Sequence, residues 1–127
     1  MTLSDKLAFW LESAKRDQRT ADVLFSNDDH HWCLFFWHLV LEKTLKAIIL
    51  NLGKEMPITH NLLLLAKEAG IAVSENDAAM LKEITSFNLE ARYDDYKLSF
   101  YKKATKKYAQ HWIAICKKYA SDWEIML

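Results

Sequence analysis

Three residues at one corner of the sequence have types that suit ligand binding. Arg92, Tyr93 and Lys97 follow a helical run and lie in a tyrosine-rich segment. A guanidinium offers a planar fork of donors to a phosphate or carboxylate, a tyrosine ring can stack on a base, and a lysine adds positive charge. We therefore predict that these three residues contact a nucleotide or another anionic ligand.

The same corner contains features that oppose this interpretation. Asp94 and Asp95 would repel a phosphate unless a cation or lysines offset their charge. Arg92 could also form a structural ion pair with Asp94, Asp17 or Glu42 and hold the fold together. The sequence leaves both interpretations open.

A polar stripe lies on an otherwise apolar helical stretch. His38, Glu42 and Lys46 are spaced four residues apart, so they share one helix face. They are candidates for lining a nucleotide-binding groove between two protomers, where ligands often bind. The alternative is a polar seam, with all hydrogen bonds satisfied, at a dimer interface.

The remaining histidines give weaker signals. His60 could contact the ligand, although a Thr-His pair ahead of a helix more often supports the helix N-terminus. His30 and His31 lie next to Asp28 and Asp29 and could bind a metal adventitiously. Adjacent surface histidines seldom make a dedicated site, so we predict no metal site and no cofactor.

Helices must position these residues. Only two glycines and one proline interrupt the 127 residues, which favours helices over a β fold with many turns. The expected helices span residues 5–25, 30–52 and 61–69, a fourth that Ser74 opens with Asp77 at the capping-box position, and a long final helix from the corner to about residue 123. We predict an all-α, up-and-down bundle of four long helices plus one short helix, in a single domain of residues 1–127.

Individual positions refine this expectation. Ser4 is a candidate cap for the first helix, and Asp17 falls on its apolar stripe, where a carboxylate must find a partner. The run WCLFFWHLVL is apolar nearly all round, so it belongs at the centre of a bundle or in a subunit interface. Tyr101 begins the expected inner stripe of the final helix.

Composition points to a cytoplasmic protein. There is no signal-peptide pattern, the most apolar segment is too short for a membrane span, and two cysteines lack metal spacing. Net charge is zero, but residues 97–127 carry seven lysines and two acids. This asymmetry indicates an anionic partner, or an exposed helix face whose lysines balance acidic neighbours.

Three stretches of the chain resemble the HEPN domains (higher eukaryotes and prokaryotes nucleotide-binding). They are WLESAKRD at residues 10–17, HLVLEKTLKAIILNLGKEMPITHNL at residues 38–62 and EARYDD at residues 90–95. Together they cover nearly the whole chain, and the second stretch is the most specific. The resemblance implies a small helical bundle that forms a homodimer.

Many HEPN proteins are metal-independent ribonucleases with an Arg-x(4–6)-His motif. Here Arg92 stands in the arginine position, but residues 96–99 are Tyr, Lys, Leu and Ser, so the histidine is absent and His111 lies too far along the final helix. What remains resembles the Arg-Tyr branch associated with minimal nucleotidyltransferases, including toxin–antitoxin pairs. The resemblance therefore implies a non-catalytic, nucleotide-binding partner subunit. The alternatives are a protein-interaction subunit without a ligand, or a ribonuclease with a degenerate motif; RNA binding is possible but not favoured.

Overall fold

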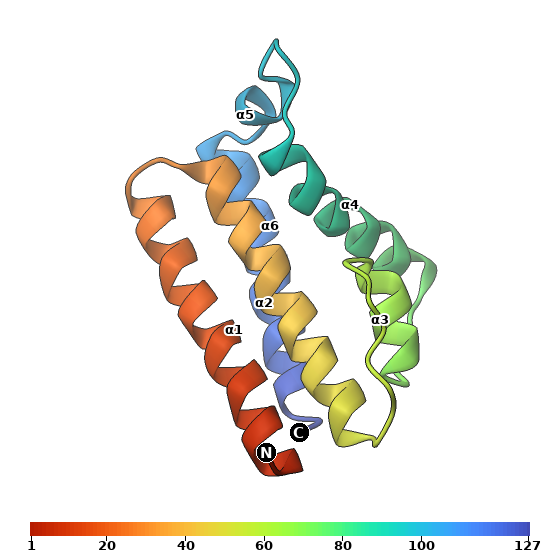
Figure 1. The fold of residues 1–127 in the computed structure, drawn as a ribbon. Helices are drawn as coiled ribbons and strands as arrows, with labels where there is room; N and C mark the ends of the chain where they lie inside the picture. Colours follow the sequence, from red (N-terminus) through yellow and green to blue (C-terminus); the bar gives the residue numbers. More distant parts are fainter.

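The computed structural model describes residues 1–127, which form an all-α bundle as predicted (Figure 1). Two of the six helices are short. The helices are α1 (Leu3–Ser26), α2 (His30–Asn51), α3 (Leu62–Glu68), α4 (Glu75–Arg92), α5 (Ser99–Lys103) and α6 (Lys106–Glu124).

Helix α2 occupies the centre of the bundle. It contacts α1, α3, α4, α5 and α6, and Figure 1 shows it between its neighbours along its whole length. Leu34, Trp37, Leu41 and Leu45 are fully buried on it. The apolar run that begins at Trp32 therefore lies at the bundle centre, because an isolated helix of this composition can bury its surface only when partners surround it.

Local capping signals set most helix starts. Ser74 and Asp77 form the expected capping box, in which each side chain accepts a hydrogen bond from the other's backbone N–H. At α1 the expected Ser4 cap is wrong. Thr2 is the N-cap, and it forms the capping box with Asp5 two residues earlier than predicted.

The Asp17 carboxylate has the partner that its place on the apolar stripe required. Lys43 of α2 donates to Asp17 at 2.5 Å and to the Ser13 hydroxyl at 2.7 Å. Both charged groups are mostly buried, with 14% and 20% of their side chains exposed. This ion pair therefore joins α1 to α2 and is not available to Arg92.

The long final helix that the sequence predicted is interrupted, and this is a correction. Helix α5 ends at Lys103, and Thr105 starts α6 as a new N-cap by accepting from the Tyr108 N–H. Leu98 precedes α5 in the left-handed conformation, with φ +55°. Tyr101 consequently lies on α5 with about half of its surface exposed, instead of in the inner stripe.

No helix of the structure combines the length and the apolar character that a transmembrane span requires.

We expect Asp17→Ala to lower the free energy of unfolding by roughly 1–3 kcal/mol, because it leaves the buried Lys43 ammonium without its carboxylate. Urea denaturation measures this change. Glu12→Ala is the matched control on the same helix, since its pair with Arg16 is solvent-exposed and should contribute about 0.5 kcal/mol or less. Equal effects of the two substitutions would contradict the structural role of the Asp17–Lys43 pair.

Candidate functional site

A continuous chain of polar contacts crosses the bundle from α2 to the end of α4. Its links run from Lys46 to Glu42, on to His60 and His38, and then through Asn88 to Arg92. Five of the seven residues predicted to bind a nucleotide therefore belong to one network. The structure brings together the polar stripe, the loop histidine and the corner arginine, although they are far apart in the sequence.

His38 is the buried centre of this network, and both of its ring nitrogens have partners. Nε2 donates to the His60 carbonyl at 2.9 Å, which leaves Nδ1 to accept from the Asn88 amide at 3.3 Å. Burial lowers the pKa of His38, and the His60 carbonyl and Glu42 carboxylate only partly oppose this. His38 is therefore a neutral structural residue without a free nitrogen for a ligand.

Glu42 is buried and neutralised by two donors. Its Oε1 accepts from His60 Nδ1 at 2.6 Å, and its Oε2 accepts from Lys46 Nζ at 3.1 Å. Lys46 also lies over the Trp10 ring, 5.7 Å from its centroid. These contacts attach the loop before α3 to α2, so the stripe is a satisfied seam within one chain.

Arg92 lies at the end of the network and has no carboxylate partner. Its Nε donates to the Asn88 carbonyl at 2.9 Å and its Nη2 to the Asn88 side-chain oxygen at 2.5 Å. The guanidinium also lies 5.1 Å from the Tyr93 ring and 5.9 Å from the Phe35 ring. Its expected structural pairs with Asp94, Asp17 or Glu42 are absent, so the guanidinium is held in place while its charge is uncompensated.

Lys97 is the third residue predicted at the corner, and its contacts do not include Arg92. Its ammonium is 5.7 Å from the ring of the highly exposed Tyr96. Tyr93, by contrast, touches Arg92 directly and is also mostly exposed. The corner therefore places Arg92 and Tyr93 together, with Lys97 further out on the loop.

The two corner aspartates start α5. Asp94 accepts from the backbone N–H groups of Asp95, Phe100 and Tyr101, and Asp95 accepts from the Ser99 N–H. Desolvation raises the pKa of Asp94, but these three N–H groups outweigh it, so the pKa lies below its usual value. The N–H donors thus hold the Asp94 and Asp95 carboxylates in place at the start of α5, where they remain charged.

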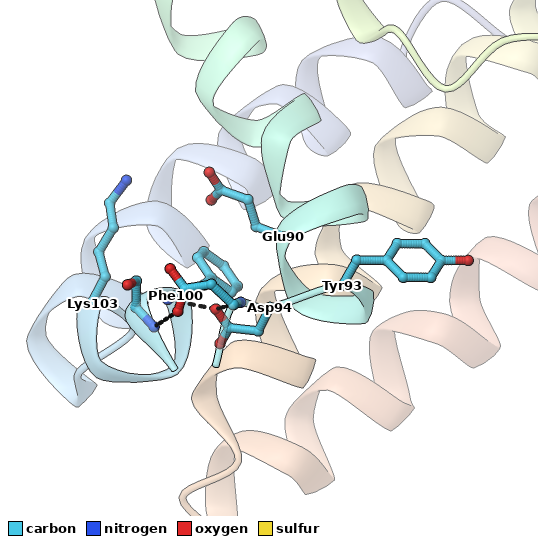
Figure 2. A pocket seen from close by; sticks show the side chains of 7 residues that line it. Glu90, Tyr93, Asp94, Phe100 and Lys103 are labelled. Carbon is cyan, nitrogen blue, oxygen red and sulfur yellow. Dashed lines mark hydrogen bonds between the residues drawn. The ribbon is translucent and has the colours of Figure 1, made fainter. Parts of the chain in front are cut away.

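A pocket of about 230 Å³ lies under this corner and is lined by Glu90, Tyr93, Asp94, Asp95, Ser99, Phe100 and Lys103. Figure 2 shows Glu90 and Asp94 around it, while the Tyr93 ring points away. Three carboxylates against one lysine make the pocket a poor site for a phosphate. Arg92 does not line this pocket, and the Tyr93 ring points away from it (Figure 2).

Asn88 and Phe35 are parts of the site that sequence reasoning missed. Asn88 is buried and connects Arg92 to His38, and Phe35 lies against the guanidinium. A signal for Asn88 was present: it stands four residues after Ile84 and four before Arg92 on the inner side of α4. An asparagine at a buried helix position requires hydrogen-bond partners.

No group of three or more His, Cys, Asp or Glu side chains is arranged to hold a metal ion. His30 lies 3.7 Å from the Asp28 carboxylate, and His31 packs against Trp32 and Tyr101 instead.

Comparison with known proteins identifies one family. The family model described as HEPN domain matches residues 7–121. The fold is similar to that in the crystal structure of the protein TT1696 from Thermus thermophilus, with a TM-score of 0.81 at 20% sequence identity, covering 96% of this chain and 98% of that chain. At this identity the likeness concerns the fold. The comparison with curated proteins gave no match.

We expect acid to destabilise the protein through His38. Because its folded pKa is lowered, its contribution to stability is complete above the ordinary histidine pKa of about 6.5 and is lost as the pH falls from there through the lower folded pKa, by up to about 1.4 kcal/mol per pH unit. Urea unfolding at several pH values should give a shallower dependence in His38→Gln than in the unsubstituted protein. Equal slopes would show that His38 is not charged during acid unfolding.

We expect Asp94→Ala to loosen α5, because three N–H groups lose their acceptor. Hydrogen exchange of the Phe100 and Tyr101 amides should become faster, while the α2 amides keep their protection. Asp95→Ala should have a smaller effect, since Asp95 accepts from a single N–H group, that of Ser99. Unchanged exchange in Asp94→Ala would mean that α5 is held by the packing of Phe100 alone.

Proposed function

The chain belongs to the HEPN domain family, and we propose that it is a nucleotide-binding module without catalytic activity of its own. In this proposal Arg92 binds phosphate, Tyr93 stacks on the base, and Lys97 adds positive charge at the edge of the site. His38, Glu42, Lys46 and His60 support the site from below through Asn88.

One observation carries the proposal: Arg92 has a fixed guanidinium with no acid to neutralise it. Two of its N–H groups are used by Asn88, and its remaining donors are available to an anion. Two aromatic rings restrict its position, which lowers the entropy lost when a ligand binds. Glu42, the buried carboxylate of the network, already has Lys46 and His60 as partners and does not need the Arg92 charge.

The lack of a histidine at the motif position after Arg92 supports a non-catalytic role. Transfer of a proton from a ribose hydroxyl needs a group with a free lone pair near the reacting atoms. His38, which reaches Arg92 through Asn88, is buried and uses both ring nitrogens. The motif positions after Arg92 hold no histidine.

We further propose that the chain is a homodimeric partner subunit of a minimal nucleotidyltransferase, as in toxin–antitoxin-like pairs. All seven lysines of residues 97–127 are exposed, and only Lys103 and Lys118 have an acid within 4.0 Å. Such a surface suits an acidic partner or its nucleotide. Trp32, Phe35 and Phe36 leave part of α2 uncovered, and a second copy packed there would bury them.

A second candidate function is a protein-interaction subunit that binds no ligand. The observation that favours it is the apolar surface of the corner loop, where Tyr93, Tyr96 and Leu98 are 70%, 90% and 49% exposed. Exposed tyrosines are frequent anchors of protein interfaces.

We expect Arg92→Ala to remove nucleotide binding while the fold persists. In a thermal-shift panel of nucleotides, a ligand at about 100 times its Kd should stabilise the unsubstituted protein by about 2.7 kcal/mol, which is roughly 4–8 °C in Tm. Arg92→Ala should show no shift, and Arg92→Lys should show a reduced one because the ammonium lacks the bidentate fork.

Arg19→Ala is the control, because Arg19 is an exposed arginine of α1 outside the site. Loss of the shift in this control would indicate non-specific charge attraction. No shift for any nucleotide in the folded, unsubstituted protein would contradict the nucleotide-binding function and favour the interaction subunit.

A further inference from the structure

Three successive contacts show which part of α2 lies beyond Arg92. Asn88 meets His38, Arg92 meets Phe35, and the Asp94 carboxylate accepts from the N–H of Tyr101, whose ring meets His31. Toward its C-terminal end, the chain of α4 therefore lies against α2 residues with progressively lower numbers. Figure 1 shows the end of α4, the start of α2 and α5 together at one end of the bundle. His31 thus lies one helical turn from Phe35, on the side toward which the chain leaves Arg92.

His31 lies between α2 and α5 and is partly exposed. The edge of its ring meets the Tyr101 ring at a centroid distance of 5.0 Å, and Trp32 is at 5.3 Å. Its Nδ1 is buried and has no hydrogen-bond partner. An unpaired polar atom of this kind opposes folding, so the packing of the fold does not explain a histidine at this position.

The other histidines of this half of the bundle have a partner for at least one ring nitrogen, although Nδ1 of His30 is also buried and unpaired. His38 and His60 are hydrogen-bonded within the polar network, and His30 has its Nε2 3.7 Å from the Asp28 carboxylate. His31 forms neither a hydrogen bond nor an ion pair. Like Arg92 and Lys97, it is a cation-forming side chain near the corner that lacks a polar partner of opposite charge.

We propose that His31 is a second ligand-binding residue of the Arg92 site, and that its protonated imidazole binds the phosphate chain of a nucleotide together with the Arg92 guanidinium. This inference rests on the proposed function and adds a residue from a different helix to it. Phe35 of α2 lies against the Arg92 guanidinium and one helical turn from His31, so its ring gives the site an apolar base. A di- or triphosphate has several anionic oxygens, so one phosphate chain can contact two separated cations.

Binding by His31 makes affinity depend on pH. The groups that act on its charge are Asp29 before α2, His30 beside it and Asp94 at the corner, and Tyr101 of α5 packs against the ring. Desolvation lowers the pKa of His31, and the two aspartates only partly oppose this. The free protein therefore holds His31 neutral near pH 7, and an anion bound beside it favours the charged form. Binding then takes up a proton, so affinity rises as the pH falls.

The test is calorimetric titration with ATP and with inorganic pyrophosphate at about pH 6 and about pH 8. We expect the unsubstituted protein to bind both probes more tightly at the lower pH, by roughly tenfold if one proton is taken up over about one pH unit. His31→Gln should bind weakly at both pH values. His31→Arg keeps a permanent charge and should bind tightly at both.

His111→Gln is the matched control, because His111 is exposed on α6 and should leave the pH dependence unchanged. The role of His31 would be overturned if His31→Gln showed the same pH dependence as the unsubstituted protein. If Arg92→Ala still failed to bind the probes in that case, the proposed function would remain intact. Absence of binding by the unsubstituted, folded protein at both pH values would overturn the proposed function and the role of His31 together.

Discussion

The buried polar face of α2 is the constraint on which the rest of the structure depends. A helix at the centre of a bundle is surrounded by apolar side chains, yet α2 carries His38, Glu42 and Lys46 in three successive turns. Buried polar groups destabilise a fold unless they are hydrogen-bonded. The loop before α3 must therefore bring His60 to Glu42, and α4 must present Asn88 to His38. These requirements fix how the second half of the chain lies on α2.

The same network explains why Arg92 is both rigid and unneutralised. Glu42, the buried acid of the network, is already paired with Lys46 and His60, and Asp17 is paired with Lys43. Asn88, a neutral residue, holds the guanidinium through its backbone and side-chain oxygens. A neutral support orients the arginine without cancelling its charge, which is the arrangement that an anion-binding residue needs.

The acidic corner has a structural explanation that does not conflict with anion binding. Asp94 and Asp95 accept the first free N–H groups of α5, and this allows a new helix to start without glycine or proline. The left-handed Leu98 is the strained residue that the tight turn requires. The carboxylates therefore organise the backbone that carries Tyr101.

The sequence by itself determined the all-α class and most of the helices, because periodicity and hydrogen bonds between near neighbours are local. It predicted the all-α bundle, the capping box at Ser74 and the need for a partner at Asp17. It missed the break between α5 and α6, where Thr105 starts α6 as a new N-cap, and it missed that Asp94 and Asp95 start α5 by accepting N–H groups up to seven residues away. Contacts such as Asn88 with His38, fifty residues apart, depend on how α4 packs against α2. Only the tertiary structure could decide that the polar stripe faces inward, that Arg92 has no acidic partner, and that His31 lies at its corner.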